Sequence, residues 1–254
     1  MTDVVVAVAA HKPAWMPSDP LYLPVQAGAC AAEPIEGYQS DAEGDEISFL
    51  NARLSELTVL YWLWRNGEAD YKGLVHYRRY FAGSGEKGIM TKQEALTRLA
   101  QAPVILPKRR HYVIETIESH YAHTMDPTHL DLVRDVLSTR EPAYLASFEA
   151  NMHKRSAHLF NMMVMRSDLM DAYCSWLFPV LLDVDERIDY ANMSAFHARA
   201  VGRLAERLMD TWIDANGISY TECAVANIEG VDWVKKGSSF LRAKAGLARY
   251  EQSF

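Results

Sequence analysis

Three groups of basic side chains stand directly after short apolar runs of the sequence. These pairs of run and basic group are Val4–Ala10 with His11 and Lys12, 73–75 with His76 to Arg79, and 104–106 with Lys108 to Arg110. Apolar runs of this length predict strands buried on both faces. Because ligands of open α/β sheets bind beyond the carboxyl ends of the strands, we expect the basic groups to meet at one edge of a sheet. A phosphate is the ligand that such a cluster favours.

The second basic group offers the most specific phosphate site. Arg78 and Arg79 stand between two tyrosines, at a strand end that should hold a guanidinium rigidly enough for bidentate bonds to a diphosphate. The alternative is that both arginines pair with surface acids such as Asp70. His76 either binds the ligand or is a buried histidine with satisfied hydrogen bonds. A strand-end lysine such as Lys12 is either a phosphate contact or solvated.

Two carboxylates and one amide are candidates for catalysis and positioning. Glu206 lies in a predicted helix between two arginines that would keep it ionised, so it is either a general base or part of a surface salt bridge. Glu56 has the same two interpretations. Asn161 interrupts the apolar run 159–165, which is short enough for a strand, and a buried amide must be hydrogen-bonded. It therefore either holds a loop or contacts a ligand.

Two patterns resemble metal sites, and both are weak. Asp183 and Asp185 form an Asp-x-Asp sequence, but it ends an amphipathic helix instead of following a buried strand. His120, His123 and His129 could bind zinc, yet the HExxH arrangement with its general-base glutamate is missing. A zinc hydrolase built on these histidines is a competing hypothesis that bound-metal analysis would test.

Strand-like and helix-like segments alternate along the chain. Predicted strands are Val4–Ala10, 22–27, 73–75, 104–106 and 159–165, and predicted helices are 47–66, 91–100, 114–122, 127–139, 168–184 and 199–215. The acidic stretch 33–46 reads as a solvated loop. This alternation predicts an α/β fold, a mostly parallel sheet flanked by helices, with a helical C-terminal half.

Composition narrows the class of protein. The chain has 254 residues, of which 49% are hydrophobic and 23% are charged, so it must fold around a core. A net charge of -7 argues against nucleic acid as a partner. The three cysteines form no CxxC pair, and no apolar run reaches the roughly 18 residues needed to span a bilayer, so we expect a cytoplasmic protein. We expect one domain, with parts 1–110, 111–230 and a basic, aromatic tail at 231–254 that either contacts an anionic membrane or packs as a terminal helix.

Several blocks together carry a resemblance to a known family. These blocks are 11–13 with 22–29 (YLPVQAGA), 47–81, which ends in HYRRYF, and 160–165 (FNMMVM). They resemble a bacterial family of capsule, exopolysaccharide and O-antigen biosynthesis proteins, long labelled a domain of unknown function and now grouped with glycosyltransferases. Segments 171–178 (DAYCSWLF) and 199–212 fit the C-terminal half of that family, so the resemblance covers nearly the whole chain.

The resemblance implies a GT-A-like domain that binds a nucleotide sugar, and some relatives are galactofuranosyltransferases that use UDP-galactofuranose. In GT-A enzymes the strand corresponding to 73–75 usually ends in Asp-x-Asp and holds a metal, whereas here it ends in His76-Tyr77-Arg78. We therefore expect cationic side chains to neutralise the leaving UDP, with no cofactor required and a divalent metal as the open alternative.

Roles for individual residues follow from this hypothesis. The expected donor-binding residues are His11, Lys12, Ser48, Glu56, Tyr77, Arg79, Lys108 and Asn161, and the expected catalytic residues are His76, Arg78 and Glu206. Glu206 or another carboxylate would deprotonate the acceptor hydroxyl for an inverting, in-line displacement. The acceptor would be a lipid-linked or oligosaccharide glycan at the inner face of the cytoplasmic membrane. A non-catalytic nucleotide-sugar or carbohydrate-binding module is the alternative that the missing Asp-x-Asp supports.

Overall fold

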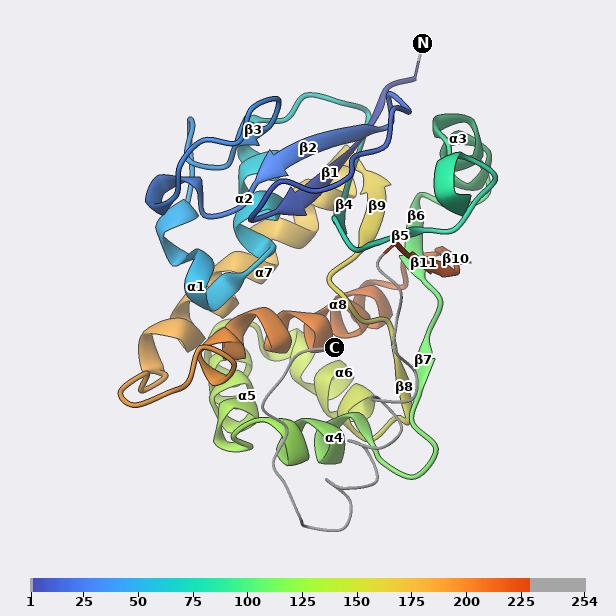
Figure 1. The fold of residues 1–254 in the computed structure, drawn as a ribbon. Coiled ribbons are helices and arrows are strands. Elements are labelled where there is room, and N and C mark those ends of the chain that lie inside the picture. The colour runs from blue at the N-terminus through green and yellow to red at the C-terminus, as the bar shows by residue number, and fades with distance from the viewer. Residues whose placement is uncertain (1, 229–254) are drawn as a thin grey trace.

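A mixed sheet forms the centre of the computed structural model, which describes residues 2–228 (Figure 1). Its main path of strands is β10 (Thr221–Cys223), β6 (Val104–Pro107), β9 (Met163–Arg166), β4 (Tyr71–His76), β1 (Val4–Ala10), β2 (Tyr22–Gln26) and β3 (Gln39–Ser40), and β5 (Arg79–Phe81) and β11 (Val225–Asn227) extend it from β4. Strands β1 to β4 are parallel, while β9 lies antiparallel between β4 and β6. β6 therefore points the same way as β4, and the carboxyl ends of β1, β4 and β6 lie at one edge, as the sequence predicts.

The valines and alanines of β1 explain why the sheet is buried on both faces. Val6 and Val8 join a core on one face, and Ala7 and Ala9 join a larger core on the other, because successive strand side chains point to opposite faces. β-branched residues also favour the extended backbone. The first predicted strand has the observed bounds, Val4–Ala10.

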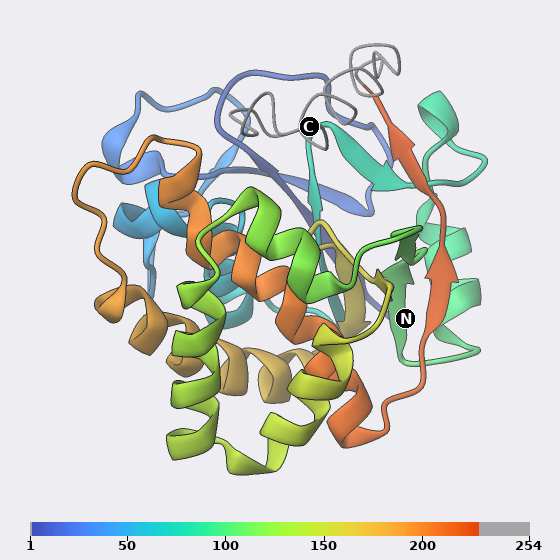
Figure 2. The same ribbon diagram turned by 90° about the horizontal axis from the view of Figure 1, so that it is seen from below.

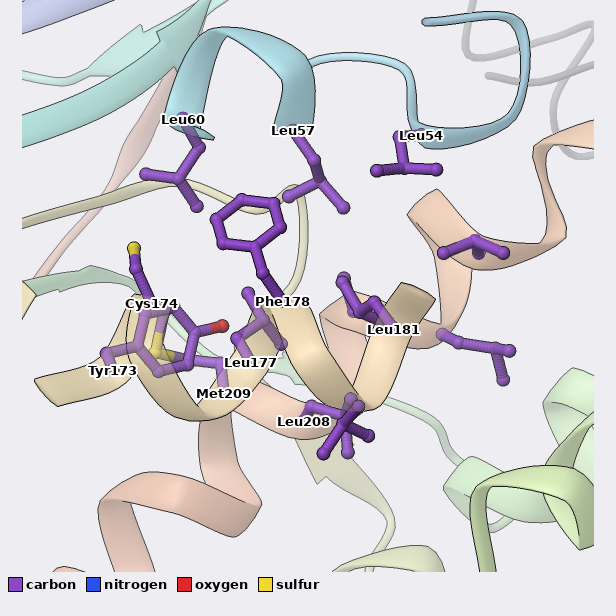
Figure 3. Close-up of a cluster of buried hydrophobic side chains, with 14 of the residues drawn as sticks. Leu54, Leu57, Leu60, Tyr173, Cys174, Leu177, Phe178, Leu181, Leu208 and Met209 are labelled. Atoms are coloured by element: carbon purple, nitrogen blue, oxygen red, sulfur yellow. The ribbon is translucent and has the colours of Figure 1, made fainter. Parts of the chain in front are cut away.

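Helices cover both faces of the sheet. On the face with the larger core lie α1 (Asn51–Leu54), α2 (Leu57–Asn66), α7 (Ser167–Arg187) and α8 (Ala200–Asn216). Figure 3 shows Phe178 of α7 directed at Leu57 and Leu60 of α2, and Tyr173, Leu181 and Leu208 belong to the same buried cluster. On the other face, α3 (Lys92–Leu99) begins at a capping box in which Thr91 and Glu94 satisfy each other's backbone N–H groups.

A helical layer packs against α8 on the side away from the sheet (Figure 2). It consists of α4 (Ile117–Thr124), α5 (Thr128–Arg140) and α6 (Pro142–Met152). A two-stranded ribbon of β7 (Arg110–His111) and β8 (Ser156–Ala157) connects this layer to the sheet. The sequence predicts α4 and α5 but not α6. It also does not predict β7 and β8, which pair with each other across a long stretch of sequence. The second half of the chain also supplies β9 to the sheet, so the parts 1–110 and 111–230 share one core.

The single helix predicted over 47–66 is wrong, because the chain breaks at Ser55. A 3-10 turn (Ser48–Leu50) leads into the short α1, and Ser55 then adopts φ 54° and ψ -129° before α2 starts. Asn51 stabilises this break by donating its side-chain amide to the Ser55 carbonyl at 2.8 Å. The apolar stripe continues across the break, so the hydrophobic pattern alone does not reveal it.

Two other expectations are corrected by the structure. The strand predicted over 159–165 begins later in the structure, where it spans Met163–Arg166, and Asn161 lies in a turn with φ 51°. The acidic stretch 33–46 is not wholly solvated, because Asp41 is 0% exposed. Its carboxylate accepts hydrogen bonds from two backbone N–H groups and from the hydroxyls of Ser48 and Thr58. Asp41 thus ties the loop after β2 to α2.

Within residues 2–228, no helix is long and apolar enough to cross a membrane. The tail predicted to contact a membrane, 231–254, lies outside the described residues.

Candidate functional site

A cleft of about 530 Å³ opens at the edge of the sheet where β1 and β4 end. The break between α1 and α2, the turn before β9, the first turns of α8 and one face of α4 complete its walls. Cavities of this size suit a small organic ligand. The cleft therefore lies where the strand-end rule places it.

Positive charge dominates the lining of the cleft, although the chain as a whole is acidic. The arginines that line it are Arg78, Arg79, Arg110, Arg199, Arg203 and Arg207, and the carboxylates are Glu56 and Glu206. The N-terminus of α8 also faces the cleft, with no acidic residue in its first turn. Six guanidinium groups against two carboxylates make the cleft a receptor for anions.

Tyr77 is the buried support for the strand-end residues. Its ring is 4% exposed and packs edge-on to His11, with ring centroids 5.5 Å apart. Lys12 Nζ lies 5.5 Å and the Arg78 guanidinium carbon 5.4 Å from its centroid. Tyr77 does not line the cleft, so the structure places it behind the basic groups.

His76 lines the cleft but carries no charge at neutral pH. Burial, reinforced by Arg78 and Arg79, lowers the pKa of His76 to about 3. Its Nδ1 accepts a hydrogen bond from the Arg78 backbone N–H at 3.3 Å, which leaves the proton on Nε2. Burial also lowers the pKa of His11. The positive charge of the group after β4 is therefore supplied by its arginines.

Arg78 and Arg79 project from the tight turn after β4. The buried Nε of Arg78 has no hydrogen-bond partner among the described residues. The guanidinium of Arg79 stacks 4.8 Å from the ring centroid of Phe160. A buried guanidinium N–H without an acceptor is costly, so an anion in the cleft would relieve it.

Glu56 stands at the helix break and lines the cleft. Its Oε1 accepts a hydrogen bond of 2.7 Å from the side-chain amide of Asn161, which also donates to the Gly202 carbonyl at 3.0 Å. Burial raises the pKa of Glu56, and the neighbouring Glu206 raises it further, against the lowering effect of the Asn161 hydrogen bond. Asn161 thus links Glu56 to the backbone of α8, and it does not itself line the cleft.

The turn that carries Asn161 is strained. Phe160 and Asn161 both have positive φ, 78° and 51°, a combination that side-chain-bearing residues rarely adopt. The Phe160 N–H donates to Glu206 Oε1 at 3.0 Å while the Asn161 amide holds Glu56. Strain of this kind persists where surrounding contacts fix the backbone, and it is common at functional sites. One turn therefore orients both carboxylates.

Glu206 differs from Glu56 in how fully it is engaged. Its Oε2 accepts a hydrogen bond of 2.6 Å from Arg207, and its Oε1 accepts the Phe160 N–H. Both oxygens therefore have protein donors. Glu56, by contrast, has only one oxygen with a hydrogen bond in the described structure.

Four predicted donor-binding residues lie outside the cleft lining in addition to Tyr77, namely Lys12, Ser48, Lys108 and Asn161. Lys12 and Lys108 are exposed, and Ser48 is buried, where it donates to Asp41 at 2.6 Å. From the basic group after β6, Arg109 pairs with Asp210 and only Arg110 lines the cleft. The expected site residues that the cleft does bring together are His11, Glu56, His76, Arg78, Arg79 and Glu206, with Asn161 bonded to Glu56.

Sequence reasoning missed most of the helical half of the cleft. Arg199, at the N-cap of α8, and Arg203 and Arg207 within α8 are spaced by four residues and therefore share one face. That spacing was the available signal. Arg110 belongs to the basic group expected after β6, whereas no pattern marks Tyr112, which follows the β7–β8 ribbon.

The two metal-like patterns do not converge on a cation site. Asp183 pairs with Arg140 and Arg187, while Asp185 pairs with Arg53. His120 and His123 both contact Glu115, and His129 contacts the Tyr121 hydroxyl at 3.2 Å. Within residues 2–228, no group of three or more His, Cys, Asp or Glu is placed to hold a metal ion.

Comparisons with known proteins identify the family and the fold. The model of a family described as a domain of unknown function (DUF4422) matches residues 5–217. The solved structure "WbbM bifunctional glycosytransferase apo structure" superposes with a TM-score of 0.83 at 23% sequence identity. That match covers 90% of this chain and 46% of the other, so this chain spans about half the length of that protein. No curated protein matches. The GT-A-like α/β fold expected from the sequence is thus shown.

Proposed function

The chain belongs to the DUF4422 family, and from this membership, the shared fold and the arginine-lined cleft we propose that it is a glycosyltransferase. The donor is a nucleoside diphosphate sugar, with UDP as the nucleoside diphosphate and galactofuranose as the first sugar to test. The acceptor is a hydroxyl of a glycan in bacterial surface polysaccharide biosynthesis. The observation that carries the proposal is the set of strand-end arginines, of which Arg78 has an unsatisfied, buried Nε.

The arginines after β4 bind the diphosphate and stabilise it as it leaves. Cleavage of the bond between the anomeric carbon and the diphosphate oxygen leaves an additional negative charge on UDP. Arg78 and Arg79 face this charge from a rigid turn, where preorganised donors stabilise a transition state most effectively. Neutral His76 serves as a hydrogen-bond donor through Nε2. This arrangement provides charge neutralisation without a required metal.

Glu56 is the better placed general base. A base must be ionised to accept a proton yet have a pKa close to the working pH, and burial raises the pKa of Glu56 towards that range. Asn161 fixes one oxygen and leaves the other for the acceptor hydroxyl. The acceptor oxygen attacks the anomeric carbon from the face opposite the diphosphate, its proton passes to Glu56, and the bond to UDP breaks with inversion.

The first experiment measures UDP release from a panel of UDP-sugars with an alkyl glycoside acceptor, with and without EDTA. Wild-type protein should release UDP only with acceptor, and EDTA should not stop it. Arg78→Gln should lower kcat/KM by a factor of a hundred or more, on the scale seen when one transition-state donor is lost. Arg155→Gln, an exposed arginine outside the cleft, is the matched control. Unchanged turnover in Arg78→Gln would remove the central claim, and UDP binding without turnover would favour a binding module.

A second pair of variants identifies the base. Glu56→Gln keeps a side-chain oxygen for Asn161 but cannot accept the proton, so kcat should fall by roughly a hundredfold or more while UDP affinity is retained. Glu206→Gln should have a smaller effect on kcat, because Glu206 orients Arg207 and Phe160. The reverse order of effects would assign the base to Glu206.

A further inference from the structure

The arginines of the cleft lie along two adjoining walls, because Arg110 is also a charged neighbour of Arg79 and Arg199 is one of Arg203. His11 and His76, at the strand ends, have Arg78 and Arg199 as their charged neighbours. Tyr112 and His120, on the helical side, have Arg110 and Arg207 as theirs. A diphosphate held by the strand-end group therefore leaves the second group, on the helical side, without an assigned ligand.

Among residues 2–228, the second group, Arg110, Arg203 and Arg207, has more positive charge than the carboxylates paired with it. Arg207 is 7% exposed and pairs with Glu206, which is also a charged neighbour of Arg203. One carboxylate thus serves two arginines, and Arg110 adds a third cation. The Nε atoms of Arg203 and Arg207 are buried and have no hydrogen-bond partner within residues 2–228. Donors of this kind in a cleft indicate an anion that is absent from the free protein.

Aromatic rings hold the second group in place. Arg203 stacks 4.2 Å from the centroid of Phe196, and Arg207 lies 5.4 Å from the centroid of Tyr121. Arg110 lies 5.5 Å from the centroid of Tyr112, whose ring packs against His120. These contacts fix the guanidinium groups before a ligand arrives, as expected for a preorganised binding site.

We propose that Arg110, Arg203 and Arg207 bind a phosphate ester carried by the acceptor substrate. This inference rests on the proposed glycosyl transfer and names the chemical class of its acceptor. Glu206 pairs with Arg207 and is a charged neighbour of Arg79, so it adjoins both arginine groups. The acceptor phosphate would lie on the helical side, and the sugar hydroxyl would reach Glu56. A phosphate, with its several charged oxygens, is a better ligand for three guanidinium groups than a neutral sugar is.

The test uses UDP, glucose 6-phosphate, glucose and inorganic phosphate as probes in calorimetric titrations. Glucose 6-phosphate should bind the UDP-saturated protein, glucose should not, and inorganic phosphate should bind more weakly than the sugar ester. Arg110→Gln and Arg203→Gln should each weaken glucose 6-phosphate binding about tenfold or more while changing UDP affinity by less than twofold. Arg78→Gln should do the reverse, and Arg155→Gln should change neither. Arg110 is exposed, so its variant should fold normally.

Each other outcome has a definite meaning. Competition between UDP and glucose 6-phosphate would assign both arginine groups to the donor and overturn the proposal. Equal binding of inorganic phosphate and glucose 6-phosphate would indicate a site for free phosphate, which also overturns it. Absence of glucose 6-phosphate binding to the wild type would do so too. Failure of the glycosyl-transfer proposal looks different, since UDP would then neither bind nor be released while the phosphate ester still binds through Arg110 and Arg203.

Discussion

Replacing His76 with asparagine should make the protein less sensitive to acid. The unfolded chain binds a proton on this histidine near its ordinary pKa of 6.5, whereas the folded protein keeps His76 neutral until about pH 3. Between these values the unfolded state holds more protons, so wild-type stability falls as the pH falls. The penalty is absent above pH 6.5 and complete below about pH 3. Asparagine cannot titrate, and its Oδ1 can accept the Arg78 N–H that His76 Nδ1 accepts.

The size of the effect follows from the shift. Each pH unit within the window costs about 1.4 kcal/mol, so lowering the pH from 6.5 to 4.5 should cost the wild type roughly 3 kcal/mol that the variant does not lose. For a chain of this size that corresponds to about 5–10 °C in Tm. Other titrating groups affect both proteins alike, so they cancel in the difference.

Urea unfolding of both proteins at pH 7.5, 6.5, 5.5 and 4.5 measures this difference. We expect the two curves of stability against pH to be parallel above pH 7 and to converge or cross below it, in favour of His76→Asn. Parallel curves down to pH 4.5 would show that His76 is protonated in the folded protein. The cleft would then carry one more positive charge than we assign to it.

Two further variants test the supports of the cleft. Glu56→Gln should be more stable than the wild type at pH 8. The raised pKa of Glu56 means that its ionisation favours the unfolded state as the pH rises above about 4.5. In thermal unfolding scans the advantage of the variant should therefore vanish near pH 4. An equal difference at both pH values would contradict the raised pKa. Asp41→Ala should lower the free energy of unfolding by about 3 kcal/mol or more in urea titrations, since the N–H groups of Gly28 and Ala29 and the Ser48 and Thr58 hydroxyls lose their common acceptor. A loss below 1 kcal/mol would mean that water replaces the carboxylate.

The strand-end half of the cleft is predictable because local pattern and topology agree there. The sequence predicts strands at Val4–Ala10 and at 73–75, and the structure has strands at Val4–Ala10 and Tyr71–His76. The carboxyl ends of parallel strands must share an edge, so His11 and Arg78 had to meet. Lys12 and Lys108 could not be sorted from them, because one residue of register decides whether a side chain after a strand faces the cleft or the solvent.

The helical half depends on information that is not local. Glu56 faces the cleft because the helix breaks at Ser55, yet the apolar spacing continues through the break. Asn161 reaches Glu56 from a turn with positive φ at two side-chain-bearing residues, which no propensity favours. Arg110 depends on a ribbon pairing across more than forty positions of sequence. Tertiary contacts decide each of these placements.

Several features of the cleft cost stability in the free protein. The turn at Phe160 and Asn161 is strained, Glu56 ionises against its burial, and the buried Nε atoms of Arg78, Arg203 and Arg207 have no partner within residues 2–228. Selection for stability alone would remove such features, whereas a site that must receive anions retains them. Anionic ligands supply acceptors to these arginines and thereby remove part of the cost. Binding energy and fold stability are therefore coupled in this cleft, through the same guanidinium groups that we assign to the donor diphosphate and to the acceptor phosphate.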